Sequence, residues 1–201
     1  MNPYADGGQP SIISSQFYTK FYNDSHPRKL ILGINPGRLG AGATGIPFTD
    51  TKRLQSHCGL SVDFHLHEPS SVFVYKMIDA FGGVNPFYSQ FYINSVCPLG
   101  FVILDSKGKE KNYNYYDSPE LTKAVEPFIL ESLQKQINFG IDTERVFCMG
   151  TGKNYKYLNA LNQAHGFFDA VVALEHPRYV IQYKAKKMDF YIDKYISLLN
   201  A

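Results

Sequence analysis

A short apolar run ends abruptly in a polar turn near the start of the chain. The run is Leu30-Ile31-Leu32, and the turn that follows it is Gly33-Ile34-Asn35-Pro36-Gly37. This pattern is typical of a strand buried inside a parallel sheet, which delivers a polar loop to the sheet edge. Ligands of open α/β sheets bind beyond the carboxyl ends of such strands. The run therefore predicts an α/β fold with a ligand-binding loop that includes Asn35.

The rest of the chain alternates predicted strands with predicted helices. Apolar runs predict strands at 30–34, 91–96, 145–149 and 170–174. Helical spacing predicts helices at 12–22, 70–81, 119–139, 153–164 and 188–199. The alternation indicates a mainly parallel sheet with helices on both faces. We expect a single domain over residues 1–201, in which residues 1–10 form a loose N-terminal tail.

Local signals define some of the boundaries between these elements. Ser118 is a predicted N-cap, because Pro119 follows it at the first helical position, and Gly140 is predicted to end that helix. The pair Ser70-Ser71 is predicted to cap the helix that runs to Phe81. We expect a long loop at 37–58, with room for a short helix after Thr49. The polar, tyrosine-rich segment 101–117 is predicted to be a solvent-facing loop or a hairpin.

Composition excludes several classes of protein. The net charge of +2 is too small to indicate nucleic-acid binding unless the basic residues are clustered. The apolar runs are too short to span a membrane, and the N-terminus lacks the pattern of a secretory signal. The three cysteines are isolated, so neither a zinc site nor an iron–sulfur cluster is indicated. We therefore expect no metal, no other cofactor and no membrane partner, and a location in a reducing, bacterial-type cytoplasm.

Three segments together resemble a known family. Residues 33–48 read GINPGRLGAGATGIPF, which is similar to the first motif of the uracil-DNA glycosylase superfamily. The resemblance is closest to its single-strand-selective monofunctional (SMUG-like) branch, which has GMNPG followed by a glycine-rich stretch and TGVPF. The segments NSVCPL (94–99) and HPR (176–178) match later motifs in the same order. The resemblance implies a three-layer α/β/α sandwich around a four-stranded parallel sheet, and three of the predicted strands end in the three motifs.

The resemblance also implies an activity. We expect a monofunctional DNA glycosylase that excises uracil, and other deaminated bases, from single- or double-stranded DNA in base excision repair. Such an enzyme extrudes the nucleotide into a pocket and reads the edge of its base. Catalysis then requires stabilisation of charge on the departing base and a positioned water, which leaves an abasic site. We expect a nucleoid-associated enzyme that acts as a monomer.

The first motif carries one predicted catalytic residue and several predicted substrate contacts. By resemblance, Asn35 positions the attacking water, Gly33, Pro36 and Gly37 surround the base, and Phe48 stacks on it. Taken alone, Asn35 would be read as a turn residue before Pro36, and Phe48 as a core ring. The later motifs favour the functional interpretation of both residues.

The second motif leaves the base-reading residue open between Asn94 and Ser95. An asparagine amide accepts from N3–H of uracil and donates to O4, which discriminates against cytosine. The spacing of Asn94 from Cys97 resembles the LNxVL run of conventional uracil-DNA glycosylases, whereas the SMUG-like pattern has one residue fewer. We expect Asn94 to read the base, with Ser95 as the lesser candidate and a strand-end cap as the alternative role of Asn94.

The third motif supplies the second predicted catalytic residue. His176, as a neutral imidazole, is expected to donate to O2 of the departing uracil anion. Arg178 and Tyr179 are expected to project into the duplex and occupy the vacated space. The family pattern is HPSPR, so the shorter HPR found here leaves the wedge geometry and the strand preference undecided.

Other basic residues are candidates for phosphate contacts. Gly150 and Lys153 belong to a Gly-Thr-Gly-Lys turn before a helix. This turn has two interpretations of about equal weight, a contact to a DNA phosphate and a plain connection between strand and helix. It is not a Walker A loop, because Asn154 follows the lysine. Further lysines precede the last helix, at positions 184, 186 and 187. His65 and His67 are interpreted as surface residues.

Two other functions remain open from the sequence. One is a module of the same fold that binds damaged bases or nucleotides without catalysis. The joint presence of Asn35 and His176 argues against this module. The other is a nucleotide-processing α/β enzyme. The absence of a carboxylate from the GINPG turn and of a Walker lysine argues against that enzyme.

Overall fold

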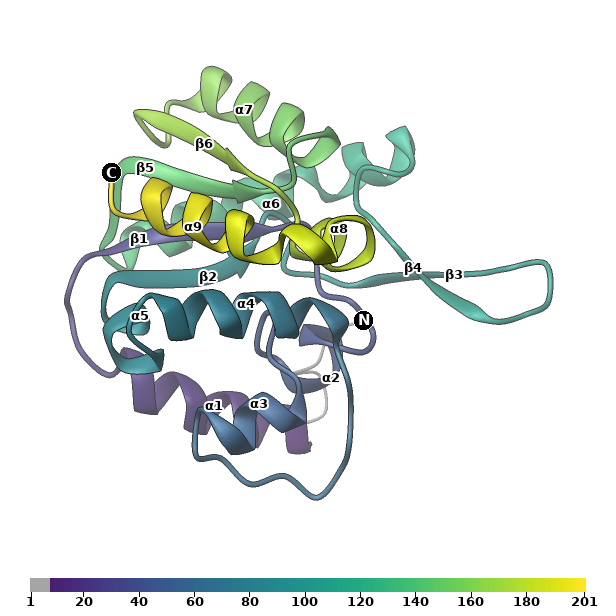
Figure 1. The fold of residues 1–201 in the computed structure, drawn as a ribbon. Helices are drawn as coiled ribbons and strands as arrows, with labels where there is room; N and C mark the ends of the chain where they lie inside the picture. The colour runs from purple at the N-terminus through teal and green to yellow at the C-terminus, as the bar shows by residue number, and fades with distance from the viewer. Residues whose placement is uncertain (1–7) are drawn as a thin grey trace.

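A four-stranded parallel sheet forms the centre of the fold (Figure 1). The computed structural model describes residues 8–201. The strands lie in the order β2-β1-β5-β6, and all three neighbouring pairs are parallel. Their bounds are β1 Arg28–Gly33, β2 Phe91–Ser95, β5 Ile141–Met149 and β6 Ala170–Leu174. The predicted α/β/α fold with a four-stranded parallel sheet is confirmed.

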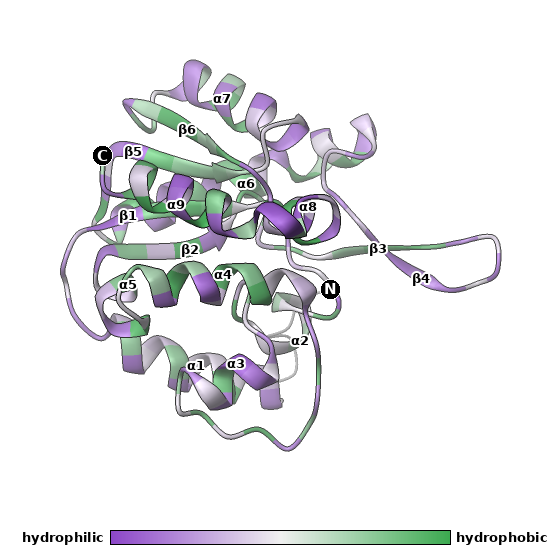
Figure 2. Cartoon of the chain, viewed as in Figure 1, coloured by the Kyte–Doolittle hydropathy of each residue, from purple (hydrophilic) through white to green (hydrophobic). Residues whose placement is uncertain are grey.

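Helices cover both faces of this sheet, because the strands are apolar on both sides (Figure 2). Alternate residues of β1 belong to two different cores: Ile31 packs into one, and Leu30 and Leu32 into the other. The core around Ile31 is closed by α1 (Gln9–Tyr22), α4 (Pro69–Ala80), α5 (Val84–Gln90), α8 (Pro177–Tyr183) and α9 (Met188–Leu199). The opposite core is closed by α6 (Pro119–Asn138) and α7 (Lys153–His165).

Short elements fill the connections. The loop after β1 contains α2 (Ala41–Thr44) and α3 (Thr51–Ser56), the second of which matches the short helix expected after Thr49. A 3-10 turn, η1 (Ala185–Lys187), directly precedes α9. The segment 101–117 forms an antiparallel hairpin of β3 (Phe101–Leu104) and β4 (Glu110–Tyr113), one of its two predicted forms.

Several predicted boundaries hold and others are wrong. The Ser118 hydroxyl accepts from the Leu121 N–H and caps α6, as predicted. The Ser70-Ser71 cap is wrong: α4 begins at Pro69 after Glu68, and Ser71 instead donates to Asp50. Both serines lie inside the first turn, because the proline takes the first helical position.

The sequence also missed parts of the helical layer. Of the expected loose tail 1–10, residues 1–7 lie outside the described residues, whereas Gln9 and Pro10 already belong to α1. The helices α5 and α8 were not predicted. Each has only seven residues and a proline in its first turn, so local signals resemble a turn. None of the helices within residues 8–201 is long and apolar enough to cross a membrane.

Candidate active site

A pocket of about 400 Å³ opens at the carboxyl edge of the sheet. The loop after β1, the end of β2, the end of β4 and the start of α8 supply its walls. The predicted site residues found there are Asn35, Pro36, Gly37, Phe48, His176, Arg178 and Tyr179. Residues separated by 144 positions in sequence therefore meet in one cavity, whose volume is typical of small-molecule sites.

Asn35 is held at both ends of its amide by backbone groups at the end of β4 and just after it. Its Oδ1 accepts from the Tyr115 N–H at 3.2 Å, and its Nδ2 donates to the Tyr113 carbonyl at 3.2 Å. These two backbone partners fix which end of the amide is oxygen. The oxygen keeps a second lone pair, so it can still accept from a water in the pocket.

Phe48 forms an apolar wall of the pocket and adopts an unusual backbone conformation. Its φ is +54°, in the left-handed region that non-glycine residues rarely occupy, and it is 8% exposed. Its ring packs on Gly33, where a Cβ would lie 3.0 Å from the ring. A larger residue at position 33 would crowd the Phe48 ring, so glycine lets the ring pack this closely. The ring centroid lies 6.0 Å from that of His176.

His176 is the N-cap residue of α8, and its orientation is set there. Its Nδ1 accepts from the Arg178 N–H at 3.2 Å. Burial lowers the pKa of His176 to about 4, with a smaller contribution from the charge of Arg178. The imidazole is therefore neutral near pH 7, with its proton on Nε2, which can donate to a ligand.

Asn94 does not line the pocket that holds Asn35 and His176. Along β2, Phe91, Ile93 and Ser95 are buried, whereas Tyr92 and Asn94 point to the opposite face. The Asn94 Oδ1 accepts from the Ser95 N–H, and Asn94 lines an adjoining cavity of about 620 Å³ that shares Pro36 with the first. Ser95 lines both cavities and is 4% exposed. The pocket that holds Asn35 and His176 is therefore lined by Ser95 and not by Asn94.

The comparisons with known proteins match this arrangement. The model of the uracil DNA glycosylase superfamily matches residues 19–200. The chain belongs to this superfamily. It is also similar to a crystal structure of wild-type SMUG2 from Pedobacter heparinus, with 56% sequence identity and a TM-score of 0.96. That similarity covers 100% of this chain and 86% of the other. No match was found among curated proteins.

The predicted SMUG-like branch and the predicted enzyme class are confirmed. The protein is a DNA glycosylase, which hydrolyses N-glycosidic bonds. Within residues 8–201, His, Cys, Asp and Glu side chains form no group that could hold a metal ion. The three cysteines are buried free thiols.

The predicted phosphate-binding turn of the glycosylase lies beside the pocket. Gly150 and Lys153 line a cavity of about 370 Å³ that shares His176 and Tyr179 with the catalytic pocket. The Lys153 Nζ lies 5.8 Å from the centre of the Tyr116 ring. Arg178 is exposed at the pocket mouth. The predicted DNA-contacting residues therefore lie on the same side of the glycosylase as its pocket.

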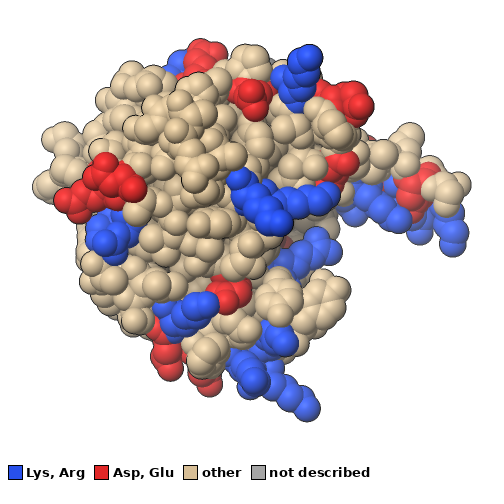
Figure 3. Space-filling view, turned by 90° about the horizontal axis from the view of Figure 1, so that it is seen from above, with Lys and Arg blue, Asp and Glu red and all other residues tan. Residues whose placement is uncertain are grey.

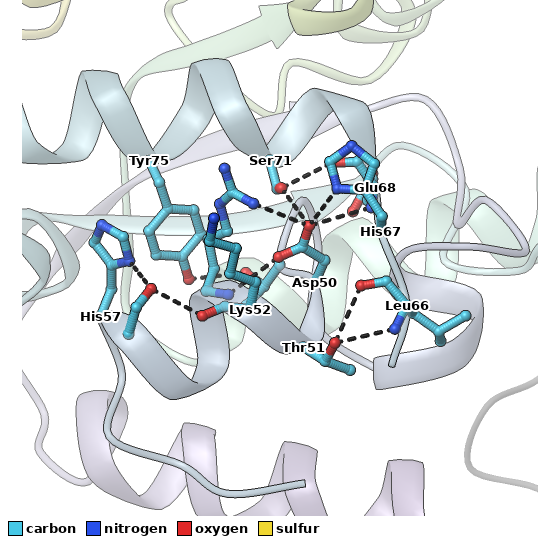
Figure 4. Close-up of polar contacts among 12 residues, drawn as sticks. Asp50, Thr51, Lys52, His57, Leu66, His67, Glu68, Ser71 and Tyr75 are labelled. Carbon is cyan, nitrogen blue, oxygen red and sulfur yellow. Dashed lines mark hydrogen bonds and ion pairs between the residues drawn. The ribbon is translucent and has the colours of Figure 1, made fainter. Parts of the chain in front are cut away.

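A buried carboxylate network supports the loop behind the pocket (Figure 4). Asp50 has no solvent exposure and accepts from the Arg53 N–H at 3.0 Å and from the Ser71 hydroxyl at 2.9 Å. Burial by itself would raise the pKa of Asp50, but these hydrogen bonds and the Arg53 charge lower it below its usual value. The His67 imidazole donates to the Asp50 carboxylate, yet His65 and His67 are both exposed, as interpreted from the sequence.

Glu68 is a second carboxyl beside Asp50, and it lines the pocket. Its carboxyl packs on Gly40, where a Cβ would lie 2.4 Å from Cδ. Its Oε2 is buried, without a hydrogen-bond partner within the described chain. Burial and the neighbouring Asp50 charge raise the pKa of Glu68 to about 8. Two adjacent carboxyls therefore differ in protonation at pH 7.

Sequence reasoning missed the support that the hairpin gives to Asn35. The segment 101–117 was predicted to face solvent, yet its backbone at Tyr113 and Tyr115 holds the Asn35 amide. Asn112 also lines the pocket and accepts from the Arg38 N–H at 3.0 Å. No local pattern connects these segments. The sequence made Ser95 only the lesser candidate, although period-two alternation from Phe91 and Ile93 already assigns it to their face.

Proposed function

We propose that this glycosylase removes uracil from DNA by hydrolysis without a covalent intermediate. The observation that carries the proposal is the pairing of Asn35 and a neutral His176 in one pocket, with the Phe48 ring as its apolar wall. A planar base, extruded from DNA, would stack on Phe48. Asn35 and His176 would then act on the attacking water and on the departing base.

The mechanism follows from the charge that develops when the bond breaks. Cleavage of the N-glycosidic bond leaves an anionic base and a cation-like sugar. The Nε2–H group of His176 would donate a hydrogen bond to O2 of the base. This hydrogen bond would stabilise the anion. A neutral donor avoids the cost of burying a cation in the dry pocket, and burial already keeps the pKa of His176 low.

Asn35 would act on the water that attacks the sugar. An amide oxygen is too weak a base to deprotonate water fully, but it can hold one in place. That is sufficient when the sugar has already become cationic. The rigid anchoring of the amide by Tyr113 and Tyr115 supports this role, because a positioned water needs a positioned acceptor.

We propose that Ser95, together with neighbouring backbone groups, contacts the base edge in this glycosylase. Ser95 lines the pocket, whereas Asn94 lines only the adjacent cavity. A hydroxyl can donate or accept, so it discriminates less than an amide of fixed orientation. Because a hydroxyl discriminates less, we propose that the enzyme also excises other deaminated bases.

The remaining proposals concern context. Gly150 and Lys153 would contact backbone phosphates, and Arg178 and Tyr179 would enter the duplex beside the extruded nucleotide. The product would be an abasic site for base excision repair. We propose that the enzyme acts as a monomer, in the cytoplasm and at the nucleoid. Three buried free thiols fit such a reducing compartment.

The test is cleavage of a defined oligonucleotide. A labelled strand with one uracil is incubated with the enzyme and treated with alkali, which breaks the strand at abasic sites. We expect scission at the uracil and none in a matched strand with thymine. The Asn35→Ala/His176→Ala double variant is the control for contaminating activity. Binding of the uracil strand without scission would instead support a non-catalytic base-binding module.

A further inference from the structure

The β3–β4 hairpin projects from the sheet edge at which the pocket opens (Figure 1). Its base is part of the site, because Asn112 and Asn114 line the pocket and the following backbone anchors Asn35. DNA that delivers a nucleotide to this pocket must lie against the same edge. The hairpin therefore lies where a flanking stretch of DNA would pass.

The hairpin exposes aliphatic side chains beyond the pocket. Leu104 is 65% exposed and Ile103 is 49% exposed, although both lie on a strand. Figure 2 shows β3 in the colour of hydrophobic residues. In the hairpin register Val102 is opposite Asn112, and Leu104 is opposite Glu110. Side chains opposite each other share a face, so Val102 and Leu104 share the face of Asn112. Val102 and Leu104 extend the pocket wall outward as an aliphatic strip, with the exposed Glu110 carboxyl beside Leu104.

Basic side chains occupy the tip of the hairpin (Figure 3). Asp105 stabilises the turn, since its Oδ1 accepts from the N–H groups of Lys107 and Lys109 at 2.8 and 3.0 Å. Its Oδ2 pairs with Lys111 at 3.3 Å. The Lys107 and Lys109 ammonium groups form no ion pair within residues 8–201. They remain available to an anionic partner.

We propose that this hairpin is a DNA-binding arm that holds the strand on one flank of the extruded nucleotide. Lys107 and Lys109 contact phosphates, and the Val102–Leu104 face packs on deoxyribose. Four residues of strand span roughly 13 Å, which is about four base-pair steps of 3.4 Å. DNA is favoured over a second copy of the chain, because two such lysine-bearing tips would repel each other. The inference rests on the proposed DNA substrate.

The test compares salt dependence on DNA with different flanks. The Lys107→Ser/Lys109→Ser variant is measured beside a control, Lys76→Ser/Lys135→Ser, which removes two exposed lysines from α4 and α6. Substrates carry one uracil with long flanks, or with the 5′ or the 3′ flank cut to two nucleotides. The Kd and the single-turnover rate are measured at several salt concentrations.

We expect the hairpin variant to bind the long substrate about ten-fold more weakly, with a single-turnover rate at saturation close to that of the wild type. The slope of log Kd against log salt should fall by about 1.8, the value for two lost phosphate contacts. The difference should vanish when one particular flank is cut and persist when the other is cut. Leu104→Ser should weaken binding about three-fold without changing the slope.

Three other results would contradict the proposal that the hairpin is a DNA-binding arm. These are a slope equal to that of the control variant, an effect that ignores which flank is cut, or a dimer that Leu104→Ser dissociates. A slower saturated rate with an unchanged slope would mean that the hairpin only supports Asn35. If the wild type leaves the uracil strand intact, the proposed function fails. The slopes measured by binding still decide whether the hairpin contacts DNA.

Discussion

The two ends of the catalytic pocket are positioned in different ways. At the loop end, Asn35 is held by backbone atoms 78 and 80 residues away in sequence. At the helix end, His176 is held by its own helix, through the Arg178 N–H two residues on. The loop end therefore depends on tertiary packing of the hairpin, whereas the helix end depends on local capping and burial. Perturbing the hairpin should affect Asn35 and spare His176.

The largest expected effect tests the loop end directly. Asn35→Ala removes the acceptor that holds the water, so we expect the single-turnover rate to fall by roughly 10²–10³-fold, the scale for one preorganised polar group. Binding of uracil DNA should change little. Gln182→Ala is the matched control, because this amide also lines the pocket but has no assigned role. Wild-type rates in Asn35→Ala would remove the residue from the mechanism.

A smaller effect is expected where the base edge is read. Ser95→Ala should slow uracil excision about ten-fold, since one buried hydroxyl contact is lost, worth about 1.4 kcal/mol. Asn94→Ala should cost less, because Asn94 lines only the neighbouring cavity. Parallel single-turnover measurements on the two variants decide between them. If Asn94→Ala proves the more damaging change, the amide reads the base, as the sequence alone suggested.

The two ends also differ in how pH acts on them. Glu68, which packs on Gly40 in the loop after Asn35, has a folded pKa of about 8 against an ordinary value of 4.5. The folded state thus holds a proton that the unfolded state releases, and stability falls as pH rises through this window. Asp50, Arg53 and His67 are the charged or titratable groups of the adjoining network.

We therefore expect Glu68→Gln to lose less stability than the wild type between pH 5 and pH 8.5, by up to a few kcal/mol. Denaturant unfolding at both pH values gives this difference. Glu144→Gln changes an exposed carboxyl and should behave like the wild type. An identical pH dependence in Glu68→Gln and the wild type would show that Glu68 is ionised in the folded state.

The sequence predicts local features well and long-range support poorly. The helix from Pro119 to Asn138 follows from Ser118 and Gly140, because capping signals are local. The four strands follow from their apolar runs. By contrast, the contact between Asn35 and the hairpin backbone could not be predicted, since backbone atoms carry no residue-specific signal. The left-handed conformation of Phe48 also requires the packed structure.

The central claim is that His176 stabilises the departing base, and the leaving group tests it most directly. His176→Ala should lower the single-turnover rate on uracil by roughly 10²–10³-fold. The loss should be smaller with 5-fluorouracil, which departs more easily and needs less stabilisation. Asn35→Ala is the internal comparison and should be less sensitive to the leaving group. An equal loss for both bases in His176→Ala would contradict the account and leave His176 a structural cap of α8.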